Sequence, residues 1–226
     1  MIAHHLIEPL SSTWWIGLIS SILVISFLLI FYKKKEVVKK EKFLKFLGFS
    51  FITTFLISNS IGIYNGTWNI QDNLPLHLCR ISFIISIIVL FTRKQWMYEW
   101  VLFLAIPSGL HSILTPELTK GVSDWFYFEY YFVHAGLIFV PLFLTIIMGM
   151  KTRADAWGKT LLRVQIPVVL IMPFNFLIDS NYMFLKAKPL VDNPLLIGEW
   201  PTYIIFLELI MVVHVFIIYK LAPNQN

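Results

Sequence analysis

"WWIGLISSILVISFLLIFY", residues 14–32, contains no charged residue and is long enough to cross the hydrocarbon core of a membrane as a helix. The rest of the chain has a similar character: of its 226 residues, 58% are hydrophobic and 14% are charged, and the mean hydropathy is +0.74. A soluble globular domain carries about 25% charged residues. We therefore expect an integral membrane protein, and no nucleic acid among its partners.

Seven apolar segments of this kind occur along the chain. None alternates polar and apolar residues with a period of two, which argues against transmembrane strands. We predict an all-α fold, a polytopic membrane helical bundle that forms a single domain over residues 1–226, with its first segment kept as a helix and not cleaved as a signal. The predicted helices span approximately residues 14–32, 43–63, 76–92, 98–114, 126–150, 161–178 and 200–219.

Most Lys and Arg residues fall on one side of this predicted bundle. The largest group is the lysine-rich connection "KKKEVVKKEKFLK", residues 33–45. Because basic connections stay in the cytoplasm, we predict that the N-terminus lies outside and the C-terminus inside. The basic residues left on the outer side are Arg80, Lys120, Lys186 and Lys188.

Polar side chains within the apolar segments gather at the predicted outer end. Burying such groups in hydrocarbon without a partner costs several kcal/mol, so they indicate either interhelical pairs or a site. The inner half of the bundle is expected to hold few polar groups apart from His214 and small hydroxyls. The outer set comprises His77, Cys79, Arg80, His111, Glu129, Tyr131, His134, Asn175, Asp179, Asn181, Tyr182, Glu199, Tyr203 and Glu208.

Two of these residues suit chemistry on lipid esters. At ~1.5 Å of helix per residue, Cys79 lies about one turn below the outer interface and His134 about two, near the ester groups of phospholipids. A thiolate there can attack an acyl ester, and an imidazole can take up the thiol proton near neutral pH.

Plainer roles compete with this interpretation. A single membrane cysteine often fills a packing gap, and membrane histidines often form interhelical hydrogen bonds. Arg80 and Lys186 could extend to lipid headgroups, and Glu208 could either pair with a neighbour or relay protons.

Several familiar catalytic signals are absent from the sequence. It has no HExxH, GxSxG or P-loop spacing, and one cysteine excludes an intramolecular disulfide or a cysteine-rich metal site. Three outer histidines could hold zinc, but no HxxxH pair places two of them on one helical turn. We therefore expect no cofactor and no metal.

Four blocks carry a resemblance to a known family. The sequence is similar, over roughly residues 44–220, to bacterial YwaF-like integral membrane proteins, which share a family with eukaryotic transmembrane protein 164. The eukaryotic relative is a cysteine-dependent acyltransferase that moves a fatty acyl group from a phospholipid to a lysophospholipid. Its essential Cys and His match Cys79 and His134. The blocks are "NLPLHLCR" (73–80), "FVHAGLIF" (132–139), "IDSNYMFLKAKP" (178–189) and "EWPTYIIFLELI" (199–210).

Residue chemistry and resemblance together predict a multi-pass acyltransferase of the bacterial cell membrane. It would act at the outer leaflet through a Cys79 thioester with His134 as base, and its partners would be membrane phospholipids and lysophospholipids. If water replaced the acceptor, the same residues would act as a phospholipase. The predicted substrate-binding residues are His77, Arg80, His111, Glu129, Asn181, Tyr182 and Lys186. Within this set, His77, His111 and Asn181 are candidate donors to the oxyanion. The candidate phosphate ligands are Arg80, Lys186 and, outside this set, Lys188.

The alternative is a non-enzymatic transporter or lipid-binding membrane protein that uses the same outer polar pocket. Glu208 and His214 would then continue a path toward the cytoplasm. A transporter needs a route through the bundle, whereas an acyltransferase needs lateral access from the outer leaflet. The depth of the cavity therefore distinguishes the two hypotheses.

Overall fold

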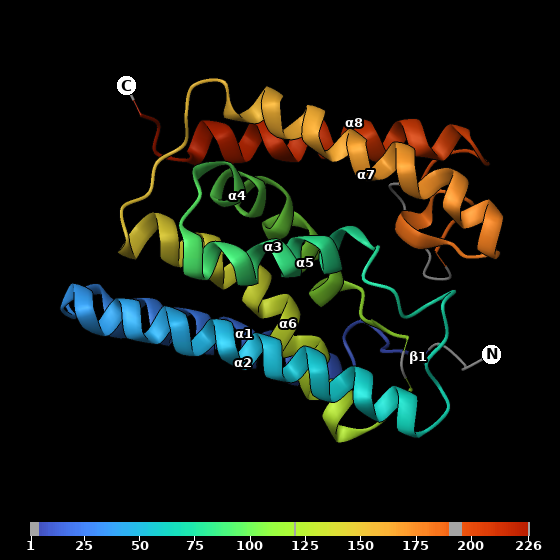
Figure 1. Ribbon diagram of the computed structural model, residues 1–226, viewed down its shortest axis with the longest axis horizontal. Helices are drawn as coiled ribbons and strands as arrows, with labels where there is room; N and C mark the ends of the chain where they lie inside the picture. Colours follow the sequence, from blue (N-terminus) through green and yellow to red (C-terminus); the bar gives the residue numbers. More distant parts are fainter. Residues whose placement is uncertain (1–4, 120, 190–195, 226) are drawn as a thin grey trace.

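The protein is built from helices that run side by side, with two very short strands, β1 His5–Leu6 and β2 Glu117–Leu118, paired antiparallel (Figure 1). The computed structural model describes residues 5–119, 121–189 and 196–225, so Lys120 lies outside the described residues. The helices are α1 Ser12–Lys33, α2 Val37–Tyr64, α3 Leu78–Thr92, α4 Gln95–Trp100, η1 Val101–Ala105, α5 Ile106–Leu114, α6 Asp124–Leu142, η2 Phe143–Ile147, α7 Ala156–Ile178, η3 Tyr182–Phe184 and α8 Thr202–Leu221.

Across the described ranges, six helical segments are long and apolar enough to cross a membrane, and α3 is a shorter apolar helix of 15 residues. Two of the six are composite. α4, η1 and α5 form the span Gln95–Leu114, and α6 with η2 forms the span Asp124–Ile147. The predicted fold class, an all-α polytopic membrane bundle, is confirmed.

Helix α6 lies at the centre and packs against α1, α2, α3 and α5. One of its close contacts needs a glycine, because a Cβ on Gly136 would lie 2.4 Å from the ring of Phe51 in α2. α7 and α8 lie together along one side of the molecule (Figure 1) and expose large side chains such as Leu170 and Phe216. These two helices therefore present much of the surface that faces lipid, while α6 is enclosed.

Several helices extend beyond the ranges predicted from hydropathy. α2 begins at Val37 instead of residue 43, and α7 begins at Ala156 instead of residue 161. The lysine-rich connection is consequently a tight turn followed by the first turns of α2. Hydropathy marks where a helix leaves the hydrocarbon, and a helix can continue into water with charged residues, so the two boundaries differ.

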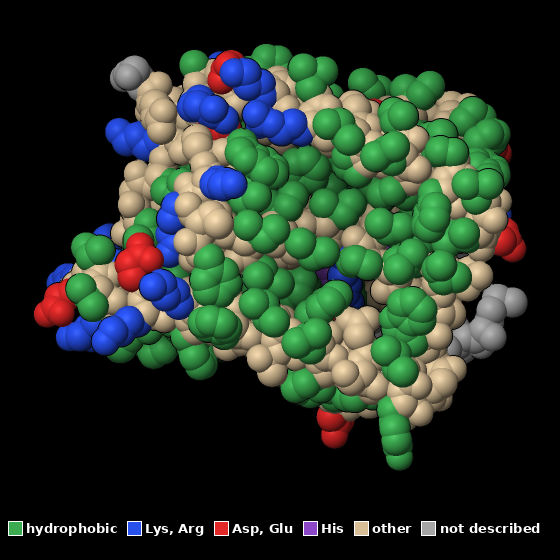
Figure 2. Space-filling view, viewed as in Figure 1, with side chains coloured by type: hydrophobic (Ala, Val, Ile, Leu, Met, Phe, Trp, Pro, Cys, Tyr) green, Lys and Arg blue, Asp and Glu red, His purple; other side chains and the backbone are tan. Residues whose placement is uncertain are grey.

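Basic side chains are concentrated at the end of the molecule where α1 meets α2, as Figure 2 shows in blue. Among them, Arg93 at the C-terminus of α3 pairs with Glu41 of α2 at 2.8 Å, so part of this charge joins neighbouring helices. The predicted orientation, with this end in the cytoplasm, stays a prediction that the charge distribution favours.

The end of the bundle that is predicted to lie in the cytoplasm is more polar than the sequence indicated. Glu99 of α4 is fully buried, and its carboxylate accepts hydrogen bonds from Gln95 Nε2 (2.9 Å), from Arg153 Nε (2.9 Å) and from the Arg153 backbone N–H (3.1 Å). This carboxylate raises the pKa of Arg153 by hydrogen bonding to it. The network ties α4 to the connection between η2 and α7, which explains why a buried carboxylate is tolerated there.

We expect Arg153→Gln to destabilise the protein more than Glu99→Gln does. Arg153→Gln leaves the fully buried carboxylate of Glu99 without its cation. Because Arg153 itself is partly exposed, the loss of unfolding free energy is about 2 to 3 kcal/mol, less than for a fully buried ion pair. Losing Glu99 leaves Arg153, which is 36% exposed and can turn to water, at a cost of about 1 kcal/mol. Unfolding of the two variants in detergent, followed by circular dichroism, measures the difference. Equal losses would contradict the asymmetry.

Candidate active site

A cavity of about 400 Å³ lies between α3, α5, α6, α7 and α8. Figure 2 shows a hollow on the side of the molecule, among hydrophobic side chains, with a basic side chain at its floor. The predicted site residues that line the cavity are Cys79, His134, His77, Arg80, His111 and Glu129, and Glu208 and His214 line it as well.

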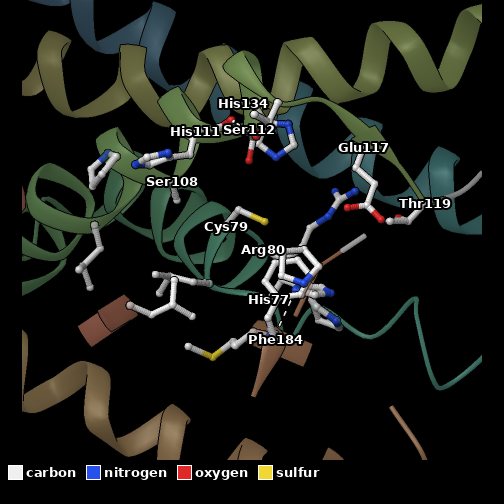
Figure 3. Close-up of a pocket in the computed structure, with 18 of the residues that line it drawn as sticks. His77, Cys79, Arg80, Ser108, His111, Ser112, Glu117, Thr119, His134 and Phe184 are labelled. Atoms are coloured by element: carbon white, nitrogen blue, oxygen red, sulfur yellow. Dashed lines mark hydrogen bonds between the residues drawn. The ribbon is translucent and has the colours of Figure 1, made fainter. Parts of the chain in front are cut away.

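Cys79 occupies the first turn of α3, which begins at Leu78 after the N-cap residue His77. Pro75 precedes this turn, where a missing backbone N–H costs no helical hydrogen bond. The Cys79 side chain is half-buried, and Figure 3 shows its sulfur pointing into the space below the α5 and α6 residues. The thiol is therefore displayed in the cavity at the helix end whose dipole favours an anion.

His134 of α6 is buried with its ring orientation fixed. Its Nδ1 lies 2.7 Å from the backbone oxygen of Tyr130, and its ring packs at 4.2 Å from the Tyr130 ring, centroid to centroid. A carbonyl oxygen can only accept, so Nδ1 carries the proton and Nε2 is left unprotonated in the neutral imidazole. Nε2 is thus available to accept a proton.

Helices α5 and α6 approach each other closely beside this histidine. A Cβ on Gly109 of α5 would lie 2.7 Å from the backbone oxygen of His134, so no larger residue fits without a shift. The Tyr130 hydroxyl donates to the Ser112 backbone oxygen at 2.8 Å and joins the same two helices. These contacts set the polar residues of α5 next to His134.

Arg80 and Glu129 form an ion pair inside the cavity, with Arg80 Nη1 2.8 Å from Glu129 Oε1. Their side chains are 17% and 3% exposed, so each charge compensates the other away from water. The pair joins the start of α3 to α6 and holds Cys79 and His134 on facing elements. At least one donor of Arg80 is thereby used for structure and not for headgroup phosphate.

The outer loop after α7 carries the predicted site residues that do not line the cavity. The Asn181 side chain forms hydrogen bonds within its own loop: it donates to the Ala187 oxygen at 2.8 Å and accepts from the Lys186 backbone N–H at 3.1 Å. Lys186 pairs with Asp179, and Lys188 pairs with Glu199 at 3.3 Å. These residues shape the rim above the cavity.

Tyr182 connects this loop to the segment that precedes Cys79. Its buried hydroxyl donates to the Ile70 oxygen at 2.7 Å and accepts from the Leu74 backbone N–H at 2.9 Å. Burial raises the pKa of Tyr182 to about 12, so the hydroxyl stays protonated throughout the physiological range. Beside it, His77 Nδ1 accepts from the Met183 backbone N–H at 3.2 Å. These three hydrogen bonds fix the entry to α3.

Tyr182→Phe is expected to lower the free energy of unfolding by about 1 to 3 kcal/mol, because it removes two hydrogen bonds of a fully buried tyrosine, each with a net contribution of about 0.5 to 1.5 kcal/mol. Residues 65–77 should also become more sensitive to protease. The matched control is Tyr219→Phe, which removes a single exposed hydrogen bond to the Ala154 oxygen. Similar losses for both variants in thermal unfolding would show that the Tyr182 hydroxyl has no special structural role.

The residues of one cavity wall were not predicted from the sequence. Ser108, Ser112 and Thr115 line the cavity together with His111, and all four lie on one face of α5 and its C-terminal cap. Their spacing of three to four residues is the signal that would have identified this face. Within the described ranges, no group of three or more His, Cys, Asp or Glu side chains could hold a metal ion.

A known protein family matches nearly the whole chain. The model of the TMEM164 family matches residues 9–219, which contain every cavity-lining residue named above. The chain belongs to the TMEM164 family. No curated protein and no solved structure shows a significant match. The resemblance carried by the four sequence blocks is confirmed at the level of the TMEM164 family, and those blocks supply the start of α3, the centre of α6, the outer loop and the start of α8.

Proposed function

We propose that this protein transfers fatty acyl groups between membrane lipids at the outer leaflet through a thioester on Cys79. One observation carries the proposal: a single cavity holds the thiol of Cys79 and a buried histidine, His134, whose Nε2 is free to accept a proton. Cysteine-dependent acyl transfer requires at least a thiol nucleophile and a base in one enclosed space.

The walls of the cavity suit a lipid. The polar face of α5 lies on one side, whereas α7 and α8 contribute apolar residues such as Val164, Val168 and Leu207. A lipid ester placed between them would have its carbonyl near polar groups and its acyl chain against hydrocarbon side chains. This division favours a phospholipid over a small polar solute.

The depth of the cavity weighs against transport. Its described lining ends at His214 on α8 and at Leu104 in η1, and the bundle below is filled by buried side chains that include Leu90, Phe103 and Phe143. A transporter would need a continuous path through this packed region. The hollow in Figure 2 opens on the side of the bundle, where a lipid can enter from its own leaflet.

The chemistry follows from these positions. His134 Nε2 takes the Cys79 proton, the thiolate attacks the donor ester carbonyl, and the lysolipid leaves with the proton from the imidazolium. An acceptor hydroxyl then attacks the thioester and releases the Cys79 thiol. Hydrogen-bond donors in the cavity would stabilise the tetrahedral oxyanion, typically by about 3 to 4 kcal/mol per donor. We further place this activity in the bacterial cell membrane.

Intact-mass measurement tests the proposal. Purified protein is incubated with phosphatidylcholine alone, and an adduct of one acyl chain that hydroxylamine removes is the expected result. Cys79→Ala should show no adduct, and added lysophospholipid should consume the adduct of the wild type. If labelled lipid binds in the cavity but no adduct forms with any phospholipid class tried, the lipid-binding alternative replaces the enzyme.

A further inference from the structure

A second histidine group lies in the same cavity, and the Cys79–His134 pair does not account for it. His111 of α5 and His214 of α8 face each other, with ring centroids 5.2 Å apart and ring planes inclined by 68°. Both line the cavity. Figure 3 shows His111 and His134 on the same side of Cys79, with the His111 ring extending away from the Cys79 sulfur.

His214 is held in one tautomer. Its Nδ1 lies 2.8 Å from the backbone oxygen of Ile210, so Nδ1 carries the proton and Nε2 is unprotonated in the neutral ring. His134 has the same arrangement with the Tyr130 oxygen. The cavity thus contains two imidazoles prepared as proton acceptors, on two different helices.

The surroundings of the second pair suit a hydroxyl group. Ser108 and Ser112 flank His111 on the same face of α5 and supply further donors and acceptors. Glu208 lines the cavity from α8, where it accepts a hydrogen bond from Gln165 Nε2 at 2.9 Å.

The geometry points to a division of labour between the two histidine groups. We infer that His134 serves the formation of the Cys79 thioester, and that the His111–His214 pair is the base for the acceptor, the hydroxyl of a lysophospholipid. This inference rests on the proposed function. In the second half-reaction the hydroxyl proton passes to the imidazole, the acceptor oxygen forms a C–O bond with the acyl carbon, and the C–S bond breaks. The departing Cys79 thiolate then takes up the proton, which regenerates thiol and neutral imidazole.

Single-turnover kinetics separate the two half-reactions. Wild type, His214→Gln and His111→Gln are acylated with phosphatidylcholine, freed of donor, and mixed with lysophosphatidylcholine while intact mass follows the acyl adduct. His5→Gln, which makes the same change at an exposed site outside the cavity, is the control. Normal acylation by a variant also shows that it is folded.

We expect His214→Gln and His111→Gln to slow deacylation about 100-fold more than they slow acylation, the usual loss for a missing general base. The thioester would therefore accumulate during turnover. Hydroxylamine, which is a strong nucleophile without deprotonation, should release the acyl group from both variants at the wild-type rate.

Three results would overturn this assignment. Transfer to lysophosphatidylcholine at the wild-type rate would show that the pair is not needed, and an equal loss in acylation and deacylation would make the pair structural. Wild-type protein that forms no adduct at all would remove the proposed function itself, a result that is visible before any histidine variant is compared.

Discussion

Cys79→Ser is expected to lower acyl transfer by about 10⁴-fold, because a serine hydroxyl at this position is a far weaker nucleophile than a thiolate. Transfer of a labelled acyl chain from phosphatidylcholine to lysophosphatidylcholine in reconstituted vesicles measures the loss. The substitution replaces one sulfur by oxygen in a half-buried side chain, so the fold should persist. The effect therefore reports chemistry and not packing.

Two controls accompany this variant. Cys79 is the only cysteine of the chain, so a thiol-alkylating reagent should inactivate the wild type to the same degree and should leave Cys79→Ser unlabelled. Ser86→Ala removes a buried hydroxyl two turns further along α3, which donates to the Ser82 oxygen, and should keep nearly full activity. A Cys79→Ala protein, which has no nucleophile at this position, would rule out the thioester route if it retained a tenth of the wild-type transfer.

His134→Gln is expected to slow thioester formation by about 10² to 10⁴-fold, the range for loss of a general base. Glutamine fills a similar volume and can still donate to the Tyr130 oxygen, but it cannot take up the thiol proton. The rate of overall acyl transfer should fall by the same factor as the rate of thioester formation. No thioester should accumulate, whereas the variants of the His111–His214 pair should accumulate it.

The pH dependence gives a sharper readout for His134. Raising the pH produces thiolate without a base, so the defect of His134→Gln relative to the wild type should shrink as the solution becomes more alkaline. Acylation rates between pH 6 and 10, measured on both proteins, provide the comparison. A ratio that stays constant over this range would mean that His134 supports the structure and does not accept the proton.

Much of the fold was accessible from hydropathy because lipid imposes long apolar helices. The prediction located the helices but placed their ends too early or too late, since α2 and α7 continue into water through charged turns. It also missed the buried carboxylate of Glu99, whose partner Arg153 comes from a connection distant in sequence. Such a pairing depends on tertiary contact, which no local pattern encodes.

The candidate site was predictable in part for the same reason. Cys79, His134 and His111 stand out as polar groups in apolar segments, and they do line one cavity. Asn181 stands out equally, yet its side chain forms hydrogen bonds within its own loop, and Arg80 forms an ion pair with Glu129. Polarity in an apolar segment indicates that a residue has a partner, but only the folded structure tells whether that partner is protein or substrate.

The shortness of α3 has a consequence for the bilayer itself. Its 15 residues extend only about 22 Å along the helix axis, against a hydrocarbon core of about 30 Å. Lipids beside a helix that is too short meet it by local thinning of the membrane. The headgroup layer next to α3 would then dip toward the helix start, and the lipid ester would descend to the sulfur of Cys79. Hydrophobic mismatch would thus bring the substrate to the thiol without extracting it from its leaflet.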